Sequence, residues 1–226
     1  MTLARRLAAE ALGSGLLLAA VVGSGIMAER LAGGQVGLAL LANTLATQGA
    51  LVALILAFAP ISGAQFNPAV SLFLALRGLL PWPHLPLYAL AQIGGAILGV
   101  WLAHGMFGEA IWQWGVKARA TPGEWLSEIV AAFGLILTIG LLERQRPEAI
   151  PYAVAGYIGA AYWFTASTSF ANPAAAIARG LTASFASIRP EDVPAFILAE
   201  LLGAMLAAAA VAYFCGARRS SQSVSG

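Results

Sequence analysis

Two asparagine–proline pairs are the polar residues of this chain that best indicate a functional site. Asn67-Pro68 lies in SGAQFNPAVSL, and Asn172-Pro173 lies in SFANPAAAIAR. Asparagine is a favoured helix N-cap and proline a favoured first helical residue, so each pair predicts the start of a short helix. The residue before each proline avoids the helical conformation, so irregular backbone should precede each helix. Each carboxamide could then donate hydrogen bonds to a passing molecule.

The composition indicates that these short helices lie inside a membrane protein. Hydrophobic residues make up 60% of the 226 residues and charged residues only 10%, whereas soluble domains are about half apolar and a quarter charged. The Asn-Pro segments are too short to cross a bilayer, and irregular backbone at membrane depth is tolerated only when it is buried or lines water. We expect six spans around them, at about 7–28, 36–58, 85–107, 125–142, 150–168 and 194–215.

The two halves of the chain resemble each other. Glu10 corresponds to Glu128, the two Asn-Pro-Ala triplets correspond, and Gln92 in LAQIGGA corresponds to Glu200 in LAELLGA. Three spans per half is an odd number, so the halves must have opposite topology. We therefore expect one domain, 1–226, built from inverted repeats at about 1–108 and 120–217, with the functional site at the midplane between them.

The paired NPA triplets, the glutamate in the first helix of each half and the six spans resemble the aquaporin (major intrinsic protein) family over nearly the whole chain. The resemblance implies an all-α membrane protein with six transmembrane helices and two re-entrant half-helices, acting as a passive channel and not as an enzyme. It implies that Glu10 and Glu128 hold the re-entrant loops, and it gives no role to Glu200. The implied pore motifs are Asn67, Pro68, Ala69, Asn172, Pro173 and Ala174.

The same resemblance places a second constriction, the selectivity filter, at Thr47, Ala160, Ser169 and Ala175. Water-selective members carry an aromatic residue, a histidine and an arginine at three of these positions, and this chain has none of them there. Four small side chains predict a wide filter that no longer restricts passage to water. Gln65 is expected to line the pore beside the first NPA, where it replaces a common histidine and cannot titrate near neutral pH.

The filter resembles that of bacterial aquaporins associated with arsenic resistance. It implies passage of small neutral solutes such as arsenite, other metalloid hydroxides, glycerol and water. A water-selective aquaporin or a plain glycerol facilitator remains the alternative. The residues do not rank arsenite against methylated arsenicals, glycerol, urea or boric acid.

Other partners are restricted by the composition. The single cysteine, Cys215, excludes an internal disulfide and a cysteine-based metal cluster, and we expect no cofactor, metal or nucleic-acid partner. Similar proteins are tetramers, which implies a homotetramer surrounded by membrane lipid. Arginines gather on the side of the two termini, so the positive-inside rule predicts a multi-pass inner-membrane protein with both termini cytoplasmic.

Overall fold

The computed structural model describes residues 1–215 of the chain. Positions 216 and 217, which end the second predicted repeat, lie outside the described residues. Arg218 and Arg219, which contribute to the predicted orientation, also lie outside them.

The described residues form α-helices joined by loops and three short 3₁₀ helices, and the predicted all-α architecture is confirmed. Each half has the same order of elements, namely two longer helices, a short one and another longer one. The α-helices are α1 Leu3–Leu31, α2 Val36–Ser62, α3 Pro68–Leu76, α4 Leu85–Phe107, α5 Pro122–Leu142, α6 Ile150–Phe164, α7 Pro173–Arg179 and α8 Val193–Cys215. The 3₁₀ helices are η1 Trp82–His84, η2 Pro147–Ala149 and η3 Pro190–Asp192.

Five of these helices, α1, α2, α4, α5 and α8, are long and apolar enough to cross a bilayer. Helix α6 has 15 residues, so it rises only about 22 Å. The sequence predicted that this span would reach residue 168, but the helix ends at Phe164 because Thr165 turns into an extended conformation. The residues from Thr165 to Asn172 are instead an irregular approach to the second Asn-Pro pair.

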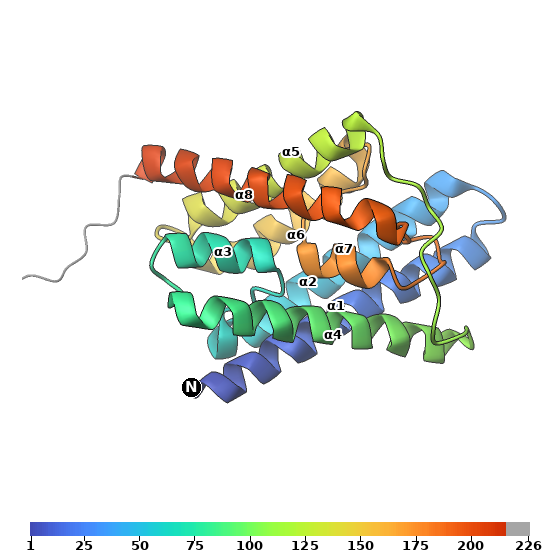
Figure 1. Ribbon diagram of the computed structural model, residues 1–226, viewed down its shortest axis with the longest axis horizontal. Helices are drawn as coiled ribbons and strands as arrows, with labels where there is room; N and C mark the ends of the chain where they lie inside the picture. The colour runs from blue at the N-terminus through green and yellow to red at the C-terminus, as the bar shows by residue number, and fades with distance from the viewer. Residues whose placement is uncertain (216–226) are drawn as a thin grey trace, which may run out of the picture.

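The two short helices lie in the middle of the bundle (Figure 1). Helix α1 packs along α4, and α5 packs along α8, while α3 and α7 lie between these two pairs and point toward each other from opposite ends. We call the end that holds the first turn of α1 and the last turn of α8 the terminal end. The opposite end, where residues 108–121 and 180–192 run, is the loop end. This arrangement brings the starts of α3 and α7 to the centre.

Small residues allow the close approach of α1 and α4. A Cβ atom added to Gly95 would lie 2.0 Å from the carbonyl oxygen of Ala11, and one added to Gly99 would lie 2.0 Å from that of Gly15. Only glycine fits at such distances. Gly156 and Ala160 in α6 have the same four-residue spacing, but nothing lies within 4 Å of a Cβ added to Gly156, and both residues are exposed.

Candidate channel site

The Asn-Pro pairs start the two short helices as their residue types predict. The Asn67 side chain accepts a hydrogen bond from the Ala69 N–H at 2.9 Å, and the Asn172 side chain accepts one from the Ala174 N–H at 3.0 Å. Both asparagines have extended backbone, and a proline occupies the first turn of each helix. Local sequence alone therefore explains where α3 and α7 begin.

The two asparagines meet by donating hydrogen bonds across the centre of the molecule. Asn67 Nδ2 donates to the Ala171 carbonyl at 2.7 Å, and Asn172 Nδ2 donates to the Phe66 carbonyl at 2.9 Å. Each amide nitrogen has a second hydrogen, and both asparagines line a central cavity. The site therefore keeps one donor from each asparagine for a molecule inside the cavity.

The other residues of the NPA triplets do not reach the cavity. Pro68, Ala69, Pro173 and Ala174 are all buried in the first turns of α3 and α7. None of these four is among the residues that line the cavity. Their part is to fix the two asparagines, because a buried proline and alanine hold the helix start against its neighbours.

The backbone before each pair is held by a buried carboxylate. Ala64 and Phe66 before the first pair, and Ser169 and Ala171 before the second, have positive φ angles between 48° and 51°, which non-glycine residues rarely adopt. Such conformations cost about 1–3 kcal/mol each and persist where surrounding contacts impose them. Hydrogen bonds from the loop N–H groups to a carboxylate on the first helix of each half are such contacts.

Glu10 and Glu128 are the carboxylates that make these bonds, and both are fully buried. Glu10 accepts the N–H groups of Gln65 and Phe66 at 3.0 and 2.7 Å. Glu128 accepts those of Phe170 and Ala171 at 2.9 and 2.7 Å. The two halves thus use the same device, and neither carboxylate lines the cavity.

Glu200 has a place that sequence reasoning missed. It is fully buried, and its Oε1 accepts the N–H of Asn172 at 3.0 Å. Its Oε2 is buried without a hydrogen-bond partner among residues 1–215. The equivalent residue in the first half, Gln92, donates its amide to Glu10 at 2.8 Å. The alignment of the two halves was the signal that could have revealed this role.

The central cavity has a volume of about 250 Å³, and its lining is both apolar and polar. It reaches from Leu79 and Glu143 at the terminal end, past both asparagines, to Tyr162 and Arg179 toward the loop end. Apolar side chains in the lining include Leu51, Ile55, Leu135, Val154 and Ile158, and polar ones include Gln65, Asn67 and Asn172.

Gln65 lines this cavity, as the sequence predicted. Its Oε1 accepts a hydrogen bond from the Ser71 hydroxyl at 2.6 Å. Ser71 also accepts from Gln92 at 2.9 Å. The glutamine is therefore oriented by a buried chain of hydrogen bonds that leads to Glu10.

The predicted selectivity filter needs one correction. Thr47, Ser169 and Ala175 line the cavity, but Ala160 does not; it is exposed on the opposite face of α6. Tyr162 occupies the expected place instead, and its hydroxyl donates to Thr47 Oγ1 at 3.3 Å. The prediction counted back from Asn172 through irregular backbone. An error of two residues rotates a helical side chain by about 200°, which exchanges the inner and outer faces.

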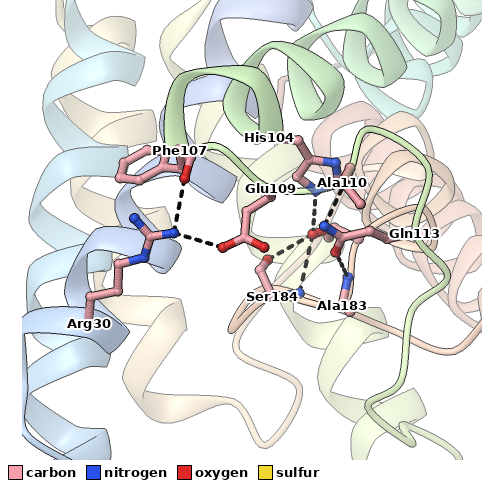
Figure 2. Close-up of polar contacts among 9 residues, drawn as sticks. Arg30, His104, Phe107, Glu109, Ala110, Gln113, Ala183 and Ser184 are labelled. Atoms are coloured by element: carbon pink, nitrogen blue, oxygen red, sulfur yellow. Dashed lines mark hydrogen bonds and ion pairs between the residues drawn. The ribbon is translucent and has the colours of Figure 1, made fainter.

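Loops at the loop end are tied together over this constriction (Figure 2). Arg30 forms an ion pair with Glu109 at 2.8 Å. The His104 ring is hydrogen-bonded to Thr182 at 2.8 Å, and Gln113 accepts the N–H of Ala183, also at 2.8 Å. The segment 108–121 is therefore fixed to α1, α4 and the loop that follows α7.

This segment also carries two basic side chains, Lys117 and Arg119. Arg119 donates to the Ser167 and Ser187 carbonyls at 2.7 and 3.1 Å, and burial lowers the pKa of its guanidinium. Burial, followed by repulsion from Arg119, lowers the pKa of the Lys117 ammonium. No group of three or more His, Cys, Asp or Glu side chains that could hold a metal occurs within residues 1–215.

Comparisons with known proteins agree with this geometry. The family described as Major intrinsic protein matches residues 1–147. The chain is 56% identical to "Aquaglyceroporin AqpS" of Rhizobium meliloti (strain 1021), over 92% of this chain and 88% of that protein. It is 38% identical to "Glycerol uptake facilitator protein" of Streptococcus pneumoniae (strain ATCC BAA-255 / R6), over 38% of this chain and 43% of that one. Its fold resembles the X-ray structure of the aquaglyceroporin from Plasmodium falciparum, with a TM-score of 0.66, 19% identity and coverage of 94% and 95%.

Proposed function

Because this chain belongs to the major intrinsic protein family, it is a multi-pass membrane channel and not an enzyme, and we propose that it conducts glycerol, arsenite, other metalloid hydroxides and water by passive diffusion. Solutes would pass through the central cavity, and Asn67 and Asn172 would mark the midpoint of their path. Flux is bidirectional, because nothing in this path couples solute movement to a second ion.

The observation that carries the proposal is the mixed lining of one continuous cavity. Aliphatic side chains, among them those of α2, α5 and α6, and the amides of Gln65, Asn67 and Asn172 line it together. A polyol fits such a path because its C–H groups can contact the aliphatic side chains while its hydroxyls accept hydrogen bonds from the amides. Undissociated arsenous acid presents three hydroxyls in a compact shape and suits the same amides.

Ions are excluded from this path chiefly by the loss of their hydration. An isolated charge transferred to apolar surroundings costs tens of kcal/mol in the idealised case. One donor from each asparagine cannot replace the hydration shell of a cation, because both groups present positive hydrogens. Neutral hydroxylated solutes avoid this cost.

The side chains at the proposed filter favour passage of solutes larger than water. Its inner-facing residues are Thr47, Tyr162, Ser169 and Ala175, so three of the four side chains are small. The tyrosine contacts α2 through its hydrogen bond to Thr47. Position 175 carries alanine in place of an arginine. The names of the relatives, an aquaglyceroporin and a glycerol uptake facilitator, support glycerol as one of the solutes. Arsenite is included among the proposed solutes because arsenous acid resembles glycerol chemically.

The proposal includes a homotetramer in the inner membrane with both termini cytoplasmic, which makes the loop end the outer face. Large apolar side chains are exposed around the bundle, for example Leu90, Leu98 and Leu198. Such side chains suit lipid or a second copy of the chain. A tetramer in detergent, measured by light scattering, tests the assembly.

The decisive experiment is a panel of fluxes in proteoliposomes. Vesicles containing the protein should shrink in hyperosmotic glycerol and then reswell, and they should take up arsenite down its gradient. Vesicles without protein provide the baseline, and an imposed pH gradient should cause no accumulation. Fast water flux with no glycerol or arsenite flux would support the water-selective alternative and overturn the proposal.

A further inference from the structure

Two charged side chains line the cavity, and the family resemblance assigned a role to neither. Glu143, toward the terminal end, forms an ion pair with Arg77 at 3.0 Å. Arg179, the last residue of α7, lines the cavity together with Thr47, Tyr162 and Ala175. Only 5% of Arg179 is exposed. A buried arginine is normally paired with an acid. No carboxylate lies within ion-pair distance of Arg179 in residues 1–215.

The position of Arg179 follows from helical geometry. It lies four residues after Ala175, and residues at this spacing are neighbours on one face of a helix. Long helical side chains lean back toward the N-terminus of their helix. A guanidinium on residue 179 therefore extends toward the level of residue 175, where the filter has lost its usual arginine.

The guanidinium is held in place on one side and free on the other. Its Nε donates to the Ala186 carbonyl, and its Cζ lies 3.3 Å from the centre of the Phe170 ring. Neither terminal nitrogen donates to any group of residues 1–215, and neither is buried without a partner. Both therefore keep accessible surface, and because Arg179 lines the cavity, we infer that their hydrogens are available to a solute inside it.

From this placement we propose that Arg179 is the charge-selective residue of the channel. It supplies a fixed cation one helical turn beyond Ala175, repels cations and donates hydrogen bonds to hydroxylated solutes. Size selection at residues 47, 162, 169 and 175 is thereby separated from charge selection at residue 179. The inference rests on the proposed function, because it assigns a residue to the same path.

Arg119 provides a matched control. Its guanidinium also lies over the Phe170 ring, at 4.9 Å, and also donates to loop carbonyls. It is 8% exposed, but it does not line the cavity. Replacing Arg119 thus removes an equally buried cation and similar loop contacts without changing the wall of the path.

The probes are urea and guanidinium, which have nearly the same size and shape but differ by one charge. Guanidinium is also weakly hydrated, so its entry depends more on the local field than that of most cations. In proteoliposomes, Arg179→Gln should raise the ratio of guanidinium to urea flux by at least about tenfold, because repulsion by a charge a few ångströms away at an effective dielectric of 20 exceeds that factor. Arg179→Lys should leave the ratio at its wild-type value, and Arg119→Gln should raise it much less than Arg179→Gln does, because Arg119 does not line the cavity.

An unchanged ratio in Arg179→Gln, with urea flux retained, would overturn the inference. So would an equal rise in Arg119→Gln. If Arg179→Gln passes no urea, the Arg179→Lys variant is the test. Urea flux in Arg179→Lys together with wild-type exclusion of guanidinium would support the role of the charge. Loss of flux and of folded protein in both variants would make Arg179 a structural residue and would also overturn it. Failure of the proposed function is separate, because it would show as absent neutral-solute flux in the wild type.

Discussion

The hydroxyl of Tyr162 donates to Thr47 at 3.3 Å and joins α6 to α2 in the lining of the central cavity. Both residues are almost fully buried. Tyr162, Thr47, Ser169 and Ala175 all line the cavity. In the proposed channel, the width of the path at these residues thus depends on a residue that counting from the NPA motif does not identify.

Replacing Tyr162 should widen the path. Tyr162→Ala should raise the flux of four- and five-carbon polyols relative to glycerol, because the ring that narrows the opening is removed. Ala160→Leu is the control, since this residue is exposed on the outer face of α6. Stopped-flow light scattering of proteoliposomes measures both. A changed polyol ratio in Ala160→Leu, with none in Tyr162→Ala, would return Ala160 to the pore.

Placing an arginine at residue 175 should narrow the solute range. Ala175→Arg fills space at the filter and adds a second cation one turn from Arg179. We expect glycerol and arsenite fluxes to fall while part of the water flux remains. The comparison of water and glycerol permeabilities in the same vesicles measures this. Unchanged uptake of the largest permeant solute would show that Ala175 does not limit the path.

Glu200 should tolerate replacement by its uncharged isostere. In Glu200→Gln, the new carbonyl can still accept the Asn172 N–H, and the new amide can donate as Gln92 does in the other half. The variant also removes a buried carboxylate oxygen that has no partner in residues 1–215. We expect thermal stability in detergent to be equal or higher and glycerol flux to be unchanged.

Glu128→Gln is the matched comparison for Glu200. This glutamate accepts two backbone N–H groups, and a glutamine amide cannot accept the second one. Leaving a buried donor unsatisfied costs about 1–3 kcal/mol, so its melting temperature in detergent should fall. Equal stability losses in the two variants would contradict the assigned difference.

Gly99 should not tolerate even one added methyl group. In Gly99→Ala the new Cβ would lie 2.0 Å from the Gly15 carbonyl oxygen, so α1 and α4 must separate. We expect a loss of stability of at least about 1–3 kcal/mol, typical of overpacking. Gly94→Ala is the control, because nothing lies within 4 Å of that position and alanine favours helix. Melting temperatures in detergent compare the two variants.

The features that could be predicted from the sequence depend on short-range physics. Spans follow from apolar length, and the starts of α3 and α7 follow from Asn-Pro capping within three residues. Both need information from only one segment at a time. The exact ends were less accurate, as α6 shows, because irregular backbone has no period that fixes its length.

The similarity of the two halves extended these predictions over a longer range. The matching sequences around Glu10 and Glu128 indicated equal roles. Each carboxylate does accept two N–H groups, from the loop that precedes the Asn-Pro pair of the same half. The same alignment paired Gln92 with Glu200 but gave no role to the charge. The contact with the Asn172 N–H becomes visible only when α8 is packed beside α7.

Residue types and their spacing were enough to predict the membrane class, the order of long and short helices and the two asparagines that lie at the centre. The packed structure was needed to show that Tyr162 and not Ala160 lines the cavity, and that Arg179 belongs to the same lining. The physical reason is that residue type and spacing fix local conformation. Which face of a helix meets a cavity depends on rotation and packing against distant segments, and no short stretch of sequence encodes them.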